Sequence, residues 1–474
     1  MRKILKSILF SFIWIAGFCQ NSDTLPLNEQ KARTAPGWIT SGIIYQIQPR
    51  AFTVEGTLKA ATDRLKKIAE LGATIVYLCP VFVADDDLDE VFWSPRQKAS
   101  GMNNPKNPYR MKDFYHVDPE YGTDEDLKEF ITESHRLRLK VMLDMVYLHC
   151  GPTAVFLKEH PDFIKRNKDG KAINASWSFP ALNFENAELR EYLWKNMEYW
   201  VKEFDADGFR CDVADGVPLD FWKAARERLE VIKPDIGMLA EGERKEDQIM
   251  AFDLNYGFTW FNTLKAVYDG KKTVLDLRKT WNEMVKARPY GVRFIRFIDT
   301  HDIANDGWHN RIEKVWGFAG VNAALLMNFT LDGVPFLYNG QEIADTARHS
   351  IFGRAPINWV NAETFEGQSR FVFCQKLCKL RIAEKAFSSG KLKWLDNDQP
   401  QSILSYMRSL NDEHVLIIIN LSNHPQHVRV LGLDGLKHKF VKVLMAEGVR
   451  KGNMESGFEF KEYGFWVGKI EIKE

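Results

Sequence analysis

Several features that would place this chain of 474 residues in a special class are missing. Lysine plus arginine and aspartate plus glutamate each number 64, so the formal net charge is zero. A balanced charge gives no electrostatic reason to expect a nucleic acid or an anionic membrane as partner. Beyond residue 20, no apolar run approaches the roughly 18 residues of a membrane-spanning helix. We therefore expect a folded enzyme or binding protein, with no nucleic-acid partner and no stable membrane insertion.

Cysteine is also scarce, with six in the whole chain. Cys374 and Cys378 stand four apart on a helical pattern, without the histidine or second cysteine pair that a zinc site requires. Cys79, Cys150 and Cys211 lie at the ends of predicted buried strands, where a free cysteine behaves as a small hydrophobe. The sequence therefore predicts buried thiols, and neither a disulfide framework nor a zinc site.

The first 20 residues differ in composition from the rest. Three basic residues precede an apolar stretch over 8–18, which is too short to span a bilayer and ends near small residues. This pattern is typical of a secretory signal, so we expect residues 1–19 to be a signal peptide and 20–37 a linker. The protein would then be exported, to the periplasm or outside the cell. A lipoprotein signal modified at Cys19 is the alternative, but Phe18 stands where such signals carry a small residue.

From residue 38 to 386, short β-branched or aromatic runs alternate with amphipathic helical stretches. Eight runs read as strands, several of them continuously apolar like strands buried on both faces: Ile43–Ile47, Thr74–Cys79, Lys140–Val146, Asp207–Cys211, Ile236–Ala240, Ala251–Leu254, Arg293–Ile298 and Val334–Tyr338. Helical patterns between them include Leu58–Leu71, Thr123–Leu137, Ala187–Glu203, Leu219–Ile232 and Trp316–Phe329. Eight such units predict an α/β fold, the (β/α)8 TIM barrel, as catalytic domain. An open doubly wound sheet is the alternative, but no glycine-rich phosphate fingerprint follows the first run.

Two long segments interrupt this alternation, and a different pattern follows it. Residues 84–112 come after the second strand and contain an acidic cluster at 85–90, which we interpret as a solvated turn. Residues 150–184 come after the third strand and predict an inserted, loop-rich subdomain. Long excursions at one end of a barrel usually wall a substrate cleft. Five further runs predict a C-terminal antiparallel β-sandwich over 387–474: Ser402–Met407, His414–Asn420, His427–Leu431, Lys439–Met445 and Phe465–Ile472.

Charged side chains follow four of the predicted strands, at the end where barrel enzymes carry their chemistry. They are Asp144 and His149, Arg210 and Asp212, Glu241, and His301 and Asp302. Glycosidic cleavage needs one carboxylate to attack the anomeric carbon and another to protonate the leaving oxygen. Arg210 stands two residues before Asp212 on the same face of a strand and supplies a cation that keeps a nucleophile ionised. Each acid alone could be a helix cap or turn residue, so only the joint pattern points to chemistry.

The same residues lie in ordered motifs that resemble those of the α-amylase clan of glycoside hydrolases. Four motifs are Asp144-Met-Val-Tyr-Leu-His149, Gly208-Phe-Arg-Cys-Asp212-Val-Ala, Leu239-Ala-Glu241 and Phe297-Ile-Asp-Thr-His301-Asp302. Three flanking signatures are Gly42-Ile-Ile-Tyr-Gln-Ile-Gln-Pro-Arg50, Asp113-Phe-Tyr-His-Val-Asp-Pro-Glu-Tyr-Gly-Thr123 and Gly333-Val-Pro. Val213-Ala214 and the segment Phe179-Pro-Ala-Leu-Asn183 resemble the neopullulanase and cyclomaltodextrinase group, although Ala181 replaces a usual Asp.

The resemblance implies a role for each residue. Asp212 would be the nucleophile, Glu241 the general acid/base, and Asp302 the stabiliser of the transition state. The subsite of the reacting sugar would be lined by Tyr109, His149, Arg210 and His301. Asp144 matches a structural family residue beside Arg210, and Glu243 is a second candidate for the acid.

The activity that the resemblance implies is retaining hydrolysis of α-glucosidic bonds, mainly α-1,4, in maltooligosaccharides and related α-glucans. A transglycosylase that rearranges glucans with the same residues is one alternative, because only its acceptor site would differ. A non-catalytic sugar-binding protein is the other, although such a protein normally lacks one of the three carboxylates.

The chain departs from the family at positions that hold calcium in many members. Leu148 stands where an Asn usually precedes the histidine, and Asp215-Gly216 stands where Lys-His often ends the second motif. The acidic calcium loop of many relatives is also absent, because Thr53-Val-Glu-Gly-Thr57 is short. Calcium takes about six to eight oxygen ligands, so we expect no metal and no other cofactor. Thr300 replaces a usual Asn in the fourth motif.

Overall fold

The structure, a computed structural model, describes residues 25–305, 311–431, 437–453 and 456–473. Eight short parallel strands pair in the order β6-β5-β4-β3-β2-β1-β8-β7. Their bounds are β1 (Ile44–Ile47), β2 (Ile75–Leu78), β3 (Lys140–Met145), β4 (Gly208–Cys211), β5 (Gly237–Ala240), β6 (Leu254–Asn255), β7 (Ile295–Arg296) and β8 (Val334–Tyr338). A bridge between Asn255 and Phe294 joins the two edges of this sheet. The sheet therefore closes, and the predicted (β/α)8 barrel is confirmed.

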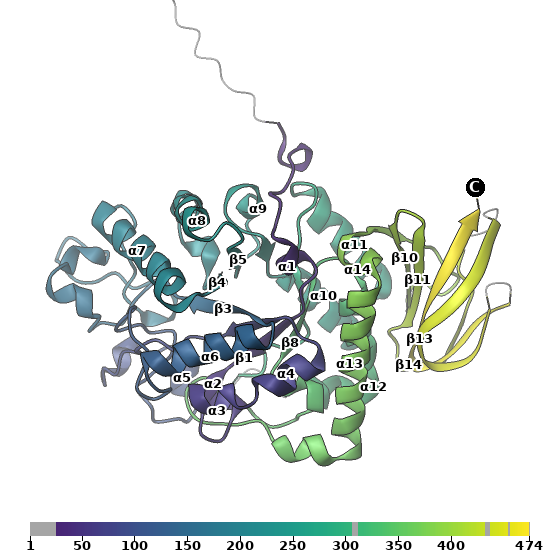
Figure 1. Cartoon of the computed structure of the whole chain (residues 1–474), viewed down its shortest axis with the longest axis horizontal. Helices are drawn as coiled ribbons and strands as arrows, with labels where there is room; N and C mark the ends of the chain where they lie inside the picture. The colour runs from purple at the N-terminus through teal and green to yellow at the C-terminus, as the bar shows by residue number, and fades with distance from the viewer. Residues whose placement is uncertain (1–24, 306–310, 432–436, 454–455, 474) are drawn as a thin grey trace, which may run out of the picture.

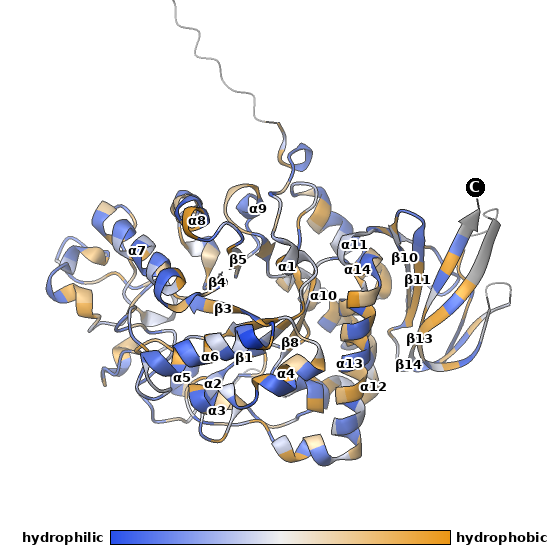
Figure 2. Cartoon of the chain, in the orientation of Figure 1, coloured by the Kyte–Doolittle hydropathy of each residue, from blue (hydrophilic) through white to orange (hydrophobic). Residues whose placement is uncertain are grey.

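Helices surround the barrel (Figure 1). They are α1 (Gly37–Thr40), α2 (Pro49–Phe52), α3 (Leu58–Thr62), α4 (Leu65–Leu71), α5 (Pro95–Ala99), α6 (Asp124–Arg136), α7 (Ala187–Phe204), α8 (Leu219–Ile232), α9 (Asp247–Met250), α10 (Phe258–Tyr268), α11 (Val274–Lys286), α12 (Ile312–Thr330), α13 (Phe365–Ala383) and α14 (Lys385–Ser389). In α6, Thr123 and Asp126 form a capping box, and Leu127, Phe130 and Ile131 are buried. Figure 2 shows that polar and apolar residues also alternate along α13.

Three predicted elements differ clearly from those observed. The predicted seventh strand, Arg293–Ile298, is shortened to Ile295–Arg296. The helix predicted over 58–71 is broken into α3 and α4. The predicted sixth strand is mostly loop, because Ala251 ends α9 and only Leu254–Asn255 pair with β5. The carboxylate of Asp253 instead accepts hydrogen bonds from Arg226 Nη2 (2.5 Å) and Met238 N (2.8 Å). This segment is therefore held in place by the hydrogen bonds of the Asp253 side chain. A pattern of apolar residues in the sequence does not predict such bonds.

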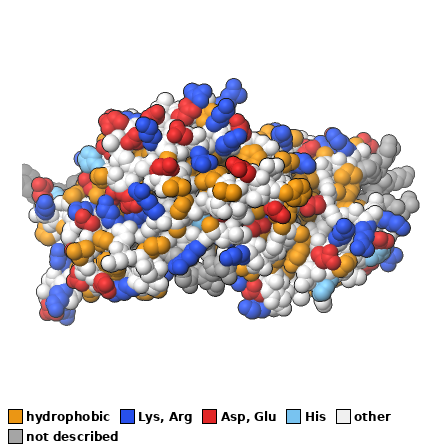
Figure 3. Space-filling model, turned by 90° about the horizontal axis from the view of Figure 1, so that it is seen from below, with side chains coloured by type: hydrophobic (Ala, Val, Ile, Leu, Met, Phe, Trp, Pro, Cys, Tyr) orange, Lys and Arg blue, Asp and Glu red, His pale blue; other side chains and the backbone are white. Residues whose placement is uncertain are grey.

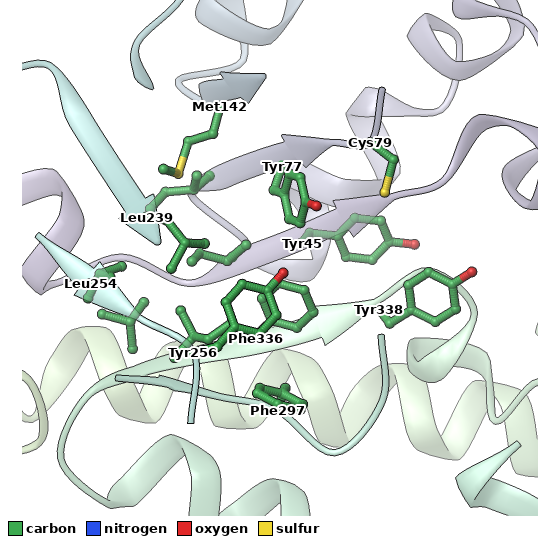
Figure 4. Close-up of a cluster of buried hydrophobic side chains, with 14 of the residues drawn as sticks. Tyr45, Tyr77, Cys79, Met142, Leu239, Leu254, Tyr256, Phe297, Phe336 and Tyr338 are labelled. Carbon is green, nitrogen blue, oxygen red and sulfur yellow. The ribbon is translucent and has the colours of Figure 1, made fainter. Parts of the chain in front are cut away.

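The barrel interior changes from apolar to polar along the strands. Successive side chains of a strand point to opposite faces, so Met142 and Asp144 face the same way on β3, as do Leu239 and Glu241 at β5. Figure 4 shows Met142 and Leu239 gathered with Leu254, Phe297 and Phe336 in one buried apolar cluster. The next inward position on β3 and at the end of β5 carries a carboxylate. The polar groups therefore collect at the carboxyl end of the barrel.

Six antiparallel strands form a second sheet after the barrel, with β13 added beside β14. They are β9 (Lys391–Trp394), β10 (Ile403–Leu410), β11 (Glu413–Asn420), β12 (Gln426–Val428), β13 (Lys437–Asn453) and β14 (Gly457–Lys473). One part of β14 pairs with β12 and another with β11, and Tyr463 between them has a left-handed backbone (φ 54°). The sheet encloses its own cluster, which includes Ile403, Ile418 and Phe458. The antiparallel C-terminal region is thus confirmed, and the predicted boundary at 386/387 falls inside α14.

The predicted linker over 20–37 is described from residue 25 and lies against the barrel. Arg33 N donates to Gln248 O at 2.7 Å, and the Arg33 guanidinium forms an ion pair with Asp253. The predicted signal peptide, residues 1–19, lies outside the described residues. Among the helices that the structure describes, none has the length and apolarity needed to cross a membrane.

The acidic cluster after β2 differs from its interpretation as a solvated turn. Asp85 is buried, and its Oδ2 accepts hydrogen bonds from Thr153 N and Thr153 Oγ1, both at 2.8 Å. A Cβ on Gly151 would lie 2.2 Å from the Asp85 side chain, so only glycine fits there. Asp85 therefore ties the segment 84–112 to the insertion after β3. The interpretation was wrong for this residue because one buried acid among five cannot be recognised from composition.

One expectation from composition agrees with the structure. The five described cysteines are all buried free thiols: Cys79, Cys150, Cys211, Cys374 and Cys378. On the face shown in Figure 3, positive and negative side chains are intermixed, in keeping with their equal numbers in the sequence.

Candidate active site

A cavity of about 320 Å3 lies at the carboxyl ends of the barrel strands. Of the predicted site residues, six line it: Tyr109, His149, Asp212, Glu241, His301 and Asp302. The seventh, Arg210, is fully buried beneath them. The structure therefore brings all seven predicted residues together, from the ends of four strands and the segment after β2.

Arg210 connects three carboxylates. Its Nη1 donates to Asp144 Oδ1 at 2.6 Å and to Asp212 Oδ1 at 2.8 Å, and its Nη2 lies 2.7 Å from Glu241 Oε1. Arg210 and Asp212 share a face because they are two residues apart along an extended chain. The planar guanidinium presents its donors in a fixed fork, so it holds Asp212 and Glu241 as immediate neighbours.

Asp144 has a supporting place under the cavity. Its Oδ2 accepts hydrogen bonds from the hydroxyls of Tyr77 (2.6 Å) and Tyr109 (3.0 Å), while Oδ1 binds Arg210. The side chain is buried and does not line the cavity. This is the arrangement expected of the structural role that the motif resemblance implies for Asp144.

Hydrogen bonds determine the tautomer of His301. The backbone N–H of His301 donates to Gln46 Oε1 (3.1 Å), which turns Gln46 Nε2 toward His301 Nδ1 at 2.7 Å. Nδ1 must therefore accept, and the ring proton lies on Nε2, where it is donated to Tyr109 Oη at 2.7 Å. The Tyr109 hydroxyl is left to donate to Asp144. The two rings also stack, with centroids 5.4 Å apart.

A strained backbone joins the nucleophile candidate to the acid candidate. Val213, directly after Asp212, has a left-handed backbone with φ 41°. A β-branched residue in this region costs about 1–3 kcal/mol. The conformation turns Val213 N toward Glu241 Oε2 at 2.8 Å, and Ala214 N donates to Glu241 O at 2.9 Å. The strain is thus used to orient the Glu241 carboxylate.

Burial and neighbouring charges shift the pKa values of the three acids, upward for Asp212 and Glu241 and downward for Asp302. Burial raises the pKa of Glu241, against the effect of Arg210, and the charge of Asp302 raises it further. Burial also raises the pKa of Asp212, against the charge and the hydrogen bond of Arg210, and the charge of Glu241 raises it further. Burial acts to raise the pKa of Asp302 as well, but His301 and Arg96 lower it well below its usual range. Such a separation provides a proton donor beside a permanent anion.

His149 is a neutral imidazole in the cavity wall. Burial lowers its pKa to about 3, and its Nδ1 has no hydrogen-bond partner among the described residues. The edge of its ring packs on Phe179, with centroids 4.8 Å apart. His149 therefore contributes an uncharged ring to the cavity wall.

Two further wall residues were missed in the sequence. Trp177, from the insertion after β3, is 39% exposed and adopts a left-handed backbone (φ 67°), as does Ser178 (φ 69°). Arg96, from α5, places Nη1 2.9 Å from Asp302 Oδ1. In the sequence, Trp177 is one of several aromatic residues of the insertion after the third strand, and Arg96 lies in the long segment after the second. Neither feature distinguishes the residue from its neighbours.

Two lesser candidates have local roles. The carboxylate of Glu243 accepts a hydrogen bond from Thr259 N at 3.0 Å and binds the Thr259 hydroxyl, and Glu243 does not line the cavity. The structure therefore does not bring this second acid candidate into the site. Thr300 Oγ1 accepts hydrogen bonds from Asp302 N (3.2 Å) and Ile303 N (3.3 Å). The hydroxyl thus shapes the turn that presents Asp302.

The fold and motifs are shared with known proteins. The family profile described as Alpha amylase, catalytic domain, matches residues 21–171 and 173–403. A cyclomaltodextrinase of Bacillus sp is 26% identical over 452 residues, 81% of this chain and 73% of that protein. An intracellular maltogenic amylase of Bacillus subtilis (strain 168) is 25% identical over 465 residues, 86% and 73% of the two chains. The crystal structure of an alpha-amylase from Lactobacillus plantarum superimposes with a TM-score of 0.76 at 25% identity, covering 91% of this chain and 99% of that chain.

These relatives confirm one expectation and correct another. The name cyclomaltodextrinase agrees with the group that the motifs resemble. The expected export is contradicted, because a relative that matches most of the chain is named an intracellular enzyme. That expectation, and the alternative of lipidation at Cys19, depended on the composition of one short segment.

Proposed function

This chain belongs to the α-amylase family of glycoside hydrolases, and from that premise we propose that it hydrolyses α-glucosidic bonds, mainly α-1,4, with retention of configuration. The observation that carries the proposal is the single guanidinium of Arg210 that holds Asp212 beside Glu241. Retaining enzymes place their two carboxyl groups about 5–5.5 Å apart, whereas inverting enzymes need about 6.5–9.5 Å to admit a water. Two carboxylates on one guanidinium support the shorter arrangement.

The proposed substrates are maltooligosaccharides and related α-glucans, short or cyclic. The cyclomaltodextrinase and the maltogenic amylase that match most of the chain support this choice. The cavity adds support, because ligand sites typically combine apolar and aromatic walls with a few polar groups. Phe179, Trp177 and Phe258 provide such walls here.

In the first step, an Asp212 carboxylate oxygen attacks the anomeric carbon. The bond from that carbon to the glycosidic oxygen breaks, and the oxygen takes the proton of Glu241 and leaves as a hydroxyl. The product is a glycosyl ester on Asp212 and an ionised Glu241. Asp302, which stays ionised, accepts hydrogen bonds from the sugar hydroxyls as positive charge develops on the ring.

In the second step, the carboxylate of Glu241 removes a proton from water. The water oxygen forms a bond to the anomeric carbon and the ester bond to Asp212 breaks, which restores both side chains. Arg210 stabilises the carboxylate that leaves. A sugar hydroxyl in place of water would give transfer, the alternative reaction of the same residues.

We also propose that this reaction needs no metal. The Leu148 Cδ1 atom lies 2.8 Å from where a Cβ on Gly216 would stand, so apolar atoms meet where many relatives carry ligand oxygens. Both oxygens of Asp215 accept backbone hydrogen bonds, from Glu243 N (2.9 Å) and Arg244 N (3.2 Å). Within the described ranges, no group of three potential His, Cys, Asp or Glu ligands is arranged to hold an ion.

The test is to incubate the protein with maltoheptaose and follow the products by thin-layer chromatography and proton NMR. We expect shorter sugars only, with the new reducing end appearing first as the α-anomer. The β-anomer appearing first would contradict retention. Products longer than maltoheptaose would assign transfer, and an unchanged substrate would leave sugar binding alone.

A further inference from the structure

A second cavity, of about 360 Å3, lies on the outer side of the barrel wall. Lys67 of α4 and Val372 of α13 line it, and both are exposed. Tyr45 of β1 and Glu342, which follows β8, also line it, and both are buried. The cavity therefore runs from the surface, where α4 packs beside α13 (Figure 1), to the strands of the barrel. Its volume lies in the range of about 300–1,000 Å3 that is usual for ligand sites.

This cavity is separate from the candidate active site. Successive side chains of a strand point to opposite faces, so Tyr45 faces outward where Gln46 faces the barrel interior. Gln46 Nε2 lies 2.7 Å from His301 Nδ1, at the candidate active site, whereas Tyr45 Oη donates to Glu342 Oε1 at 2.7 Å. Among the described residues, none lines both cavities. A ligand of the outer cavity would therefore occupy a site of its own.

The two cations of the outer cavity are engaged by other groups. Lys67 Nζ forms an ion pair with Glu70 Oε2 at 2.9 Å. The guanidinium of Arg64 lies over the ring of Trp359, 3.8 Å from its centroid, in a cation–π contact. The rest of the wall is mainly apolar, with side chains that include Phe52, Ile68, Leu71 and Phe371.

The neutral polar side chains of the wall also have partners. Trp359 Nε1 donates to Phe52 O at 2.7 Å, and Gln368 Nε2 donates to Glu363 O at 3.2 Å. These bonds hold both donors against the backbone that surrounds the cavity. The carboxyl group of Glu342 differs from them.

Glu342 carries the one buried polar atom of this wall that lacks a hydrogen-bond partner among the described residues, Oε2. Its other oxygen, Oε1, accepts the hydrogen bond of Tyr45. Burial raises the pKa of Glu342 to about 7, against the effect of that hydrogen bond, so its neutral and ionised forms are both populated near neutral pH. A buried polar atom without a partner costs free energy, and a ligand that supplies the partner removes this cost.

The chemistry of the wall indicates the class of ligand. A hydroxyl group suits Glu342 Oε2 in either protonation state, because it donates to a carboxylate and accepts from a carboxylic acid. A charged group would have to leave water for an apolar cavity, which is costly. The rings of Phe52, Trp359 and Phe371 suit a flat apolar body. We propose that this cavity binds a small, uncharged aromatic molecule that carries one hydroxyl group, with the hydroxyl at Glu342.

The experiment measures the Kd of 2-naphthol and that of naphthalene, which has the same rings without the hydroxyl, by ligand-detected NMR titration. We expect the wild type to bind 2-naphthol about 2- to 13-fold more tightly, the effect of one hydrogen bond. In Glu342→Met, which keeps the length and removes both oxygens, this ratio should fall toward one. Glu366→Met replaces an exposed carboxylate of α13 outside the cavity wall and should match the wild type.

Ala362→Trp tests the location of the site. Ala362 is half-buried and lines the cavity, so an indole there occupies the space that the ligand needs. Both compounds should lose their binding, with the fold checked by thermal melting. Binding retained in a folded Ala362→Trp would place the compounds elsewhere and would overturn the proposal.

Three other results would also overturn it: no binding to the wild type, equal binding of the two compounds, or an unchanged ratio in a folded Glu342→Met. The comparison of the two compounds on the wild type needs no variant, so it tests the hydroxyl contact even where Glu342→Met does not fold. None of these measurements depends on whether the protein cleaves a sugar.

Discussion

The floor of the cleft and its walls are built differently. The floor consists of residues at strand ends, where Arg210 is fully buried and binds three carboxylates within 2.6–2.8 Å. The walls come from the segments after β2, β3 and β8, where Trp177 is 39% exposed and Arg96 21%. Strand ends hold side chains in geometry that the barrel itself determines, whereas inserted segments can vary without disturbing it.

This difference suggests that the floor and the walls of the cleft have different functions. The groups that we propose to form and break bonds lie on the floor, where small displacements are costly to the rate. The walls provide the side chains that we expect to contact the rest of a bound sugar chain. Substitutions on the floor should therefore reduce turnover of every substrate, and substitutions in the walls should change the preference among substrates.

The largest effect is expected from Asp212→Asn. Loss of the attacking carboxylate closes the covalent route at nearly constant volume, so maltoheptaose hydrolysis should fall by about 10⁴-fold or more. Rates are measured by release of reducing sugar, and the fold is checked by thermal melting. More than a tenth of the activity in a folded variant would refute the assignment of the nucleophile.

Glu241→Gln should separate substrates by their leaving groups. An activated aryl maltoside needs little protonation of its leaving oxygen, so its first step should be largely spared. Maltoheptaose should lose about 10²–10⁴-fold. Stopped-flow release of the aryl group measures the first step directly. An equal loss for both substrates would show that Glu241 is not the acid.

Trp177→Ala tests the wall. If the exposed ring stacks on a sugar, its loss should cost about 0.5–1.5 kcal/mol, a fall of about two- to thirteenfold in kcat/KM for maltoheptaose. Trp177→Phe, which keeps an aromatic ring, is the matched control and should lose less. Hydrolysis of a short aryl glucoside should change little in either variant. An equal loss for this substrate would show that Trp177 affects turnover of every substrate, like the residues at the strand ends.

Neutral substitutions of Glu241 and Asp302 should change the melting temperature near pH 7 in opposite directions. The pKa of Glu241 is raised on folding, so its contribution to stability falls as pH rises above the ordinary value of about 4.3. Glu241→Gln should therefore melt a few degrees higher near pH 7, and the gain should shrink near pH 4. The pKa of Asp302 is lowered, so Asp302→Asn should melt lower near pH 7, and the loss should shrink in acid. The same sign for both variants would contradict this electrostatic description.

The smallest effect, none, is expected from removing calcium. Binding of an ion to the folded state would raise the melting temperature. EDTA and added calcium should leave both melting temperature and rate unchanged within error. A fall with EDTA that calcium restores would reveal a site, for which the insertion 150–184 is the first place to search.

Much of the floor could be predicted. Period-two alternation places Arg210 and Asp212 on one face, and the rule that barrel chemistry lies at strand ends selects Glu241 and Asp302. The same rule selects His149, the motif resemblance added Tyr109, and the structure brings all of these residues together at one cavity. The two-residue strands β6 and β7 were predicted too long, because their ends depend on partners elsewhere in the barrel.

The walls could not be predicted in the same way. Arg96 and Asp302 are 206 residues apart in the sequence, and no periodic pattern links them. Asp85 was expected in solvent, yet its burial depends on Thr153 and Gly151 in another insertion. No pattern in the insertion after β3 predicts the left-handed backbone of Trp177.

The sequence by itself determined the barrel, the antiparallel C-terminal region and the set of residues at the strand ends, because local periodicity and short motifs specify them. Only the tertiary structure decided the proton position on His301, the place of Arg96 and the use of Val213 to orient Glu241. Those features arise from contacts between groups distant in the chain. Such contacts form only when the strands close into a barrel and the inserted segments pack over its mouth.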